Sequence, residues 1–293
     1  MTATLTLPAI LLLAASAAAA DAPSLEELAN ASYAGVEEKP VTLADGEWQG
    51  EPFVPGGASR PRLTLARGFR LVGDVDGDAA NEAVVLLAES SGGSGSNLYV
   101  AVVARRDGKL VNLATALVGD RVQVRGGRVA GGRVGLEVVQ AGPEDAACCP
   151  SQLAIRSFRL EKDQLVEGKP ELLGALSLAS LAGSDWVLTH FDERDPAPAE
   201  PETTLAFNDD GVAGSSGCNR YFGSPEAGES PGELSFGPLG GTRMACPEAV
   251  MKLEQRYLGA LGSVVKFGFV AGKLALTYPD GNGVRALLFA PRP

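Results

Sequence analysis

Two stretches of the sequence decide the fold, GSSGCNRYFG at residues 214–223 and TRMACPEA at residues 242–249. Each carries one cysteine: Cys218 in a loop rich in glycine and serine, and Cys246 just before a predicted helix start. A loop, a short strand around Leu234 and Phe236, and a turn separate the two thiols. In an oxidising compartment, a disulfide between them would stabilise the fold by roughly 3–4 kcal/mol. The alternative is two buried free thiols that behave as small apolar side chains.

These stretches belong to an ordered series of motifs. A tryptophan strand at residues 184–188 comes first, followed by an apolar strand around Leu205 and Phe207, then the two stretches, a helix and two or three closing strands. The motif residues are Trp186, Gly217, Cys218, Asn219, Arg220, Thr242, Met244 and Cys246. In this order they resemble the META/HslJ-like domain, a small bacterial module and domain of unknown function.

The resemblance implies a mostly antiparallel, partly open β-barrel with one packed helix. It also implies an exported or membrane-anchored protein with a loose link to envelope stress and drug tolerance. No catalytic residues come with that family, so the resemblance assigns none to this chain.

The length of 293 residues suits two domains. We predict a signal peptide at 1–20, a β-rich N-terminal domain at 21–166, a linker at 167–179 and the META-like domain at 180–293. Gly168 and Pro170 mark the break at the linker. The fold class is therefore mainly β (α+β), with an N-terminal antiparallel β sandwich or curled sheet and a C-terminal partly open barrel.

The first twenty residues are typical of a secretory signal. An apolar core at residues 9–15 leads into the small residues 18–20, a cleavage site before Asp21. Residues 1–6 contain no Lys or Arg, so either the amino terminus supplies the positive charge or the true start lies upstream. After cleavage, no apolar run reaches the roughly 20 residues that span a bilayer. We expect a periplasmic or secreted protein with no transmembrane segment.

Charge and histidine content exclude several classes of function. The net charge of −11 argues against nucleic acid and anionic membranes as partners, because both attract basic patches. The chain contains one histidine, His190, which nearly excludes a histidine-based zinc site. A Ser-His-Asp triad would have to use this residue. His190 lies on a predicted strand, which favours a structural role.

Residues 24–166 predict a short helix followed by many antiparallel strands. Ser24 and Glu27 form a capping box for a helix that should run to about Ser32, and residues 33–62 should wrap the first domain. Residues 83–88 are wholly apolar, as expected for a central strand. The pair Asp107–Gly108 predicts a hairpin between strands at 98–104 and 110–117.

An acidic loop joins two of these strands. Its carboxylates occupy positions 1, 3, 5 and 9, and the backbone carbonyl at position 7 would add another oxygen ligand for Ca²⁺. The five residues are Asp74, Asp76, Asp78, Ala80 and Glu82. The loop resembles the calcium-binding hairpins of integrin-type repeats, with Ala79 where glycine is usual. The alternative is an acidic turn chosen for its geometry, so Ca²⁺ is a possible cofactor and no other is expected.

Cys148 and Cys149 are adjacent, which is too close for an ordinary disulfide. Their pairing stays open between a vicinal disulfide, a bridge from one of them to another cysteine, and two buried thiols. A reactive cysteine is the least favoured interpretation, because no histidine is near in sequence and the CxxC spacing is absent.

Three hypotheses for function follow. The first is an exported, non-enzymatic envelope protein that binds or stabilises an envelope partner. The second is a carrier of a small apolar molecule or lipid inside the half-barrel, which requires that Phe236, Phe267, Phe269 and Phe289 line a cavity instead of filling the interior. The third is a thiol-dependent enzyme that uses Cys148 and Cys149.

Overall fold

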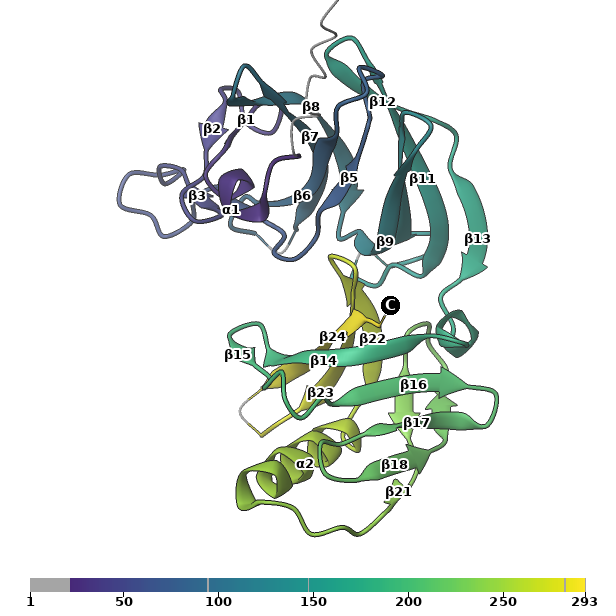
Figure 1. Cartoon of the computed structure of the whole chain (residues 1–293). Helices are drawn as coiled ribbons and strands as arrows, with labels where there is room; N and C mark the ends of the chain where they lie inside the picture. Colours follow the sequence, from purple (N-terminus) through teal and green to yellow (C-terminus); the bar gives the residue numbers. More distant parts are fainter. Residues whose placement is uncertain (1–21, 94, 147, 282, 293) are drawn as a thin grey trace, which may run out of the picture.

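The computed structural model describes residues 22–93, 95–146, 148–281 and 283–292, which form two lobes (Figure 1). The predicted signal peptide, 1–20, lies outside the described residues. Strands dominate both lobes, as the sequence predicts. Among the described residues, the structure has no helix with the length and apolar character of a membrane span.

The N-terminal lobe contains two large antiparallel sheets. The first has the order β3-β4-β6-β7-β8, with β5 also paired to β6. Its strands are β3 (Glu47–Gln49), β4 (Arg62–Leu65), β5 (Leu71–Gly73), β6 (Glu82–Ser90), β7 (Asn97–Arg106) and β8 (Lys109–Asp120). The second has the order β12-β11-β10-β9, with β13 also paired to β11. Its strands are β9 (Gln123–Ala130), β10 (Arg133–Gln140), β11 (Gln152–Glu161), β12 (Gln164–Glu167) and β13 (Glu171–Ala175).

One apolar core lies between these two sheets. Val84 and Val102 from the first sheet share it with Leu136 and Phe158 from the second. The opposite face of the first sheet packs against Leu28 and the other apolar residues of the N-terminal segment. Strand β6 is therefore buried on both faces, which explains its continuous apolar sequence. The wrapping segment contains α1 (Leu25–Leu28) and the two-stranded sheet of β1 (Ser32–Tyr33) and β2 (Val41–Thr42).

Helix α1 has the predicted capping box: the Glu27 amide donates to the Ser24 hydroxyl, and the Ser24 amide donates to the Glu27 carboxylate. The helix ends at Leu28, before the predicted end near Ser32. The reason is the buried Tyr33, which pairs with Val41 across β1 and β2 and donates its hydroxyl proton to the Leu28 carbonyl at 2.8 Å. Strand pairing therefore competes with the last turn of the predicted helix.

The C-terminal lobe is built on one open antiparallel sheet in the order β21-β18-β17-β16-β14-β24-β23-β22, with β15 also paired to β14. Its strands are β14 (Asp185–Asp192), β15 (Asp195–Pro196), β16 (Thr204–Asn208), β17 (Gly211–Ser215), β18 (Arg220–Gly223), β21 (Gly240–Gly241), β22 (Lys266–Val270), β23 (Lys273–Pro279) and β24 (Val284–Pro291). A separate hairpin joins β19 (Pro225–Ala227) to β20 (Leu234–Phe236), and α2 runs over Glu248–Leu261. Among the described strands, no pairing joins β21 to β22, so the barrel is not closed.

The predicted linker at 167–179 is corrected by the structure. Residues Glu171–Ala175 form β13, which pairs with β11 at the edge of the second N-terminal sheet. Gly168 and Pro170 therefore separate two strands of one sheet, and the 3₁₀ helix η1 (Leu178–Leu181) follows directly. Leu176 is already buried in the C-terminal core. Only a few residues connect the two lobes.

The turn between β22 and β23 reaches the N-terminal lobe (Figure 1). The Gly272 amide donates to the Val124 carbonyl at 2.9 Å, and the Phe269 amide donates to Oε1 of Gln123 at 2.8 Å. The Arg125 guanidinium lies 5.6 Å from the centre of the Phe269 ring. Ala271, at the tip of the turn, packs on the core between the N-terminal sheets. The two lobes are thus fixed by specific contacts.

Candidate functional site

The motif loop at residues 216–219 connects β17 to β18. Gly217 has a φ of +103°, a backbone conformation that disfavours every residue with a side chain. A Cβ at this position would also lie 3.4 Å from side-chain atoms of Pro201 and Leu253. Glycine therefore lets the loop turn beneath α2 and directs the next two residues, Cys218 and Asn219, toward residues 242–246.

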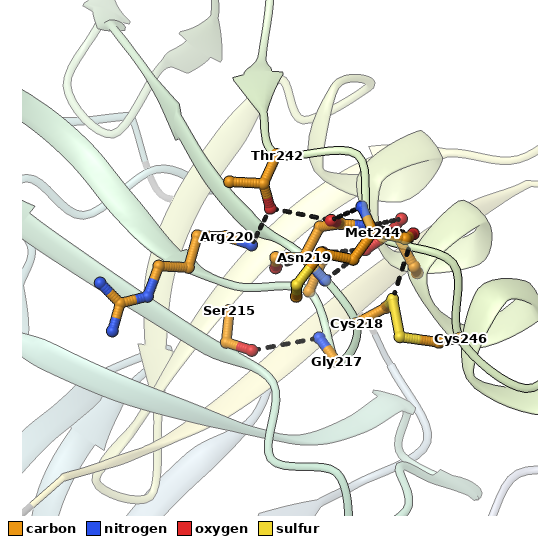
Figure 2. Close-up of a disulfide and its surroundings, with 10 residues drawn as sticks. Ser215, Gly217, Cys218, Asn219, Arg220, Thr242, Met244 and Cys246 are labelled. Atoms are coloured by element: carbon orange, nitrogen blue, oxygen red, sulfur yellow. Dashed lines mark hydrogen bonds between the residues drawn. A yellow bond between two sulfur atoms is a disulfide. The ribbon is translucent and has the colours of Figure 1, made fainter.

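Asn219 is the centre of the loop (Figure 2). Its Oδ1 accepts hydrogen bonds from the Thr242 hydroxyl at 2.8 Å and the Met244 amide at 2.7 Å. Its Nδ2 donates to the Met244 carbonyl at 3.4 Å and to Oε1 of Glu254 at 3.0 Å. The Asn219 amide donates to Oε2 of Glu254 at 2.9 Å. A buried amide with all these partners fixes two distant segments in one geometry.

Glu254 on α2 is a residue that the sequence motif does not include, because a charged side chain usually faces solvent. It is only 9 % exposed, and the Ser216 hydroxyl also donates to its carboxylate. Burial opposes ionisation, but the hydrogen bonds from Ser216 and Asn219 outweigh it and lower the pKa of Glu254. Glu254 lies four residues after Val250 and three before Tyr257, spacings that place these three side chains on one face of α2, and this is the signal that could have found it.

A disulfide joins Cys218 to Cys246 across this network, with the two Cα atoms 6.0 Å apart (Figure 2). The Thr242 amide donates to the Arg220 carbonyl at 3.0 Å, and the Arg220 amide donates to the Thr242 hydroxyl at 3.2 Å. The covalent bond and the hydrogen bonds therefore tie residues 242–246 to the loop at two neighbouring places.

The remaining motif residues have separate surroundings. Trp186 on β14 is buried in the C-terminal core, and its Nε1 donates to the Ser184 hydroxyl at 2.7 Å. The side chains of Arg220 and Met244 are exposed. The motif loop therefore forms a hydrogen-bonded framework around the buried carboxylate of Glu254, and the polar groups of this framework bond to one another.

Cys148 and Cys149 form a vicinal disulfide, and both residues are exposed. This excludes a bridge from either of them to another cysteine, and it also excludes two buried thiols. The nearby Asp145 is held by the Gly142 amide at 2.7 Å and by the amide and hydroxyl of Ser151, and these bonds lower its pKa. The hydrogen bonds of Asp145 therefore join Gly142 to Ser151, and the disulfide lies between them in sequence at the surface.

The loop that carries this disulfide forms one wall of a cleft of about 730 Å³ between the lobes. Glu144, Asp145 and Cys149 line it from the N-terminal lobe. Ser230 and Glu233, from the connection between β19 and β20, line it from the C-terminal lobe together with Lys266 on β22. Sequence reasoning missed this cleft because its two walls come from segments that lie far apart in the chain, with Ser151 on one and Gly228 on the other.

The acidic loop lies between β5 and β6, away from the motif loop in sequence. The structure brings carboxylate oxygens of Asp74, Asp76 and Asp78 within 4.8 Å of one another. Glu82, the fourth predicted carboxylate, is fully buried at the start of β6. Ala80 lies in the same loop, and its amide donates to Oδ1 of Asp78 at 2.8 Å. Calcium binding by these residues stays a prediction at this point.

His190 lies on β14 and is half-buried. Its Nδ1 is buried without a hydrogen-bond partner in the part of the chain that the structure describes. Burial, assisted by the charge of Lys273, lowers the pKa of His190. The residues that line the cleft between the lobes do not include it.

Comparison with known proteins places the C-terminal lobe in a family. The model of the META domain matches residues 179–291. No curated protein gives a significant match. Among solved structures, the chain is similar to the NMR structure of a protein from Burkholderia xenovorans, with 31 % identity over 39 % of this chain and 85 % of that one, and a TM-score of 0.31. The C-terminal part of this chain, residues 179–291, belongs to the META domain family.

Proposed function

We propose that this chain is an exported, non-enzymatic protein of the bacterial envelope that binds a partner in the cleft between its lobes. The observation that carries the proposal is the cleft itself, which is walled by both lobes and holds carboxylates, hydroxyls and one ammonium group. Clefts between domains are common places for binding sites. A role in envelope stress or drug tolerance stays an expectation from the family resemblance.

The cysteines support export. All four are in disulfides, Cys148 with Cys149 and Cys218 with Cys246. Disulfides form and persist in the periplasm and outside the cell, whereas the cytosol keeps most thiols reduced. The disulfide between Cys218 and Cys246 joins residues 28 positions apart, and it closes the segment that carries the hydrogen-bond network around Asn219.

The chemistry near the cleft supports binding in preference to catalysis. The sulfur atoms of Cys148 and Cys149 are bonded to each other, so neither is a thiolate nucleophile while the disulfide persists. The carboxylate of Asp145 is occupied by hydrogen bonds. The histidine that a nucleophilic mechanism would use as a base, His190, lies on β14 outside the cleft lining.

The packing of the C-terminal core argues against the carrier hypothesis. The four phenylalanines that would line a cavity are all buried in one cluster. The rings of Phe267 and Phe269 are 6.4 Å apart, and Phe289 lies 6.3 Å from Tyr257. Rings at these separations contact one another edge to face. They fill the interior of the half-barrel, where an acyl chain would otherwise have to lie.

Site-specific photocrosslinking in the native host tests the proposal. A benzoylphenylalanine at Ser230, which is exposed in the cleft, should give a discrete adduct detectable by mass spectrometry. The control is the same group at Asp163, which is exposed in the turn after β11, at the far end of that strand from the cleft. Equal labelling at both positions, or none at Ser230, would contradict a partner in the cleft.

A further inference from the structure

The hydrogen bonds of the acidic loop leave particular oxygens without a backbone partner. Asp74 accepts from the amides of Gly77 at 2.7 Å and Ala79 at 3.1 Å, one at each oxygen. Asp76 and Asp78 each use Oδ1 for an amide two residues later, at 3.2 Å and 2.8 Å. Oδ2 of Asp76 and Oδ2 of Asp78 are therefore the oxygens that the backbone of this loop does not engage.

Glu82 supplies a third oxygen from a different environment. It is 0 % exposed, and its Oε2 accepts from the Val75 amide at 2.8 Å. Its Oε1 is buried without a hydrogen-bond partner among the described residues. A buried carboxylate oxygen in this state costs free energy unless a cation compensates it.

One nitrogen atom marks the point where the three oxygens converge. Nη2 of Arg106, at the end of β7, contacts Oδ2 of Asp76 and lies 3.2 Å from Oδ2 of Asp78 and 3.5 Å from Oε1 of Glu82. This nitrogen carries two hydrogens, so it cannot make a separate hydrogen bond to each of the three oxygens. With Asp74, the loop sets four carboxylates against one guanidinium, an excess of three negative charges when all are ionised.

We propose that these oxygens form a Ca²⁺ site and that Arg106 is a tethered cation that competes with the metal. Ca²⁺ would lie near the position of Nη2, between the oxygens of Asp76, Asp78 and Glu82. The Arg106 side chain is 32 % exposed and Asp78 is 45 % exposed, so the guanidinium can move toward solvent and the ion can enter. Irregular loops rich in carboxylates suit Ca²⁺ better than Mg²⁺, which demands a near-octahedral site.

The competition has a measurable consequence. A unit charge about 4 Å from the metal opposes its binding strongly, even at the effective dielectric constant of a protein surface. Removal of this charge by Arg106→Gln should therefore tighten the dissociation constant for Ca²⁺ at least about tenfold. Lys109→Gln is the matched control, because it removes one exposed positive charge three residues away, across the same hairpin turn.

Calorimetric titration of the full mature chain with CaCl₂ tests the proposal. The wild type should bind with a dissociation constant of about 10⁻⁴–10⁻³ M, the range of extracellular calcium modules. Arg106→Gln should tighten this constant as stated, Lys109→Gln should change it less than about threefold, and Asp76→Asn should abolish the heat. Wild-type chain should also melt at a higher temperature in 10 mM CaCl₂ than in EGTA, to an extent that MgCl₂ does not match.

Two results would overturn the proposal. Wild-type chain that gives no heat and no shift in melting temperature with Ca²⁺ excludes the site, and this result does not depend on the folding of any variant. Equal calcium affinity in Arg106→Gln and Lys109→Gln, with both variants folded by circular dichroism, excludes the competition. Photocrosslinking at the cleft is independent of both results, so the proposed function stands or fails separately.

Discussion

Replacement of Glu254 by alanine tests the structural role of the META motif. The substitution removes the acceptor for three donors: the Ser216 hydroxyl, the Asn219 amide and the Asn219 side-chain Nδ2. Hydrogen bonds to a charged group contribute about 1.5–3 kcal/mol each, and the losses within one network are not additive. We expect Glu254→Ala to lower the free energy of unfolding of this lobe by about 3–5 kcal/mol.

The assay is urea denaturation followed by tryptophan fluorescence. The chain has two tryptophans, Trp48 in the N-terminal lobe and Trp186 in the META core. In a Trp48→Phe background, the signal reports only the META domain. Gln255→Ala is the matched control, because it removes an exposed polar side chain from the next position of α2. Its effect should stay within about 0.5 kcal/mol.

Glu254→Gln adds a graded test. Glutamine keeps one acceptor oxygen but places an NH₂ group against a donor. The free energy of unfolding of Glu254→Gln should therefore lie between those of the wild type and Glu254→Ala. The pKa of Glu254 is lowered below its ordinary value of 4.5, so its stabilising contribution is present above about pH 4.5 and declines as the pH falls through the folded pKa. An alanine variant as stable as Gln255→Ala would refute this account of the network.

Three further predictions concern other parts of the chain. Replacing both Cys218 and Cys246 by alanine should lower the free energy of unfolding of the META domain in urea by about 3–4 kcal/mol. Dithiothreitol should destabilise this domain in the wild type but not in the variant, which lacks the disulfide. Ala79→Gly should raise the melting temperature of the N-terminal lobe, because Ala79 has a φ of +67° and glycine relieves about 1 kcal/mol of strain; an unchanged or lower value contradicts this. The pKa of His190 is lowered by burial and by Lys273, so the wild type should lose stability as the pH falls below 6.5 toward the folded pKa. His190→Gln should lack that part of the pH dependence, and identical profiles contradict the assignment.

The sequence predicts those elements whose cause is local. The capping box of Ser24 and Glu27 and the hairpin turn at Asp107–Gly108 both occur where the pattern places them, with positive φ at both turn residues. The apolar run at 83–88 is the central strand β6 because both faces are buried. The order of motifs is enough to predict a META domain, and its match covers residues 179–291.

What the sequence does not predict depends on distant partners. Glu254 looks like a surface residue until Asn219, 35 positions earlier, supplies its donors. The segment after Gly168 has the composition of a linker, but it forms β13 because it pairs with the edge of β11. Arg106 is 24 positions from Glu82, and only the pairing of β6 with β7 brings the two together. Local residue propensities do not determine which distant segments of the chain pair with one another.

The central claim is that this chain is exported, and the most direct test is the intact mass of the protein isolated from its native host after alkylation without reduction. The account predicts a mass that lacks residues 1–20 and carries no alkyl groups, because all four cysteines are bonded. A mass that retains residues 1–20 and carries four alkyl groups would contradict export and, with it, the proposed envelope function.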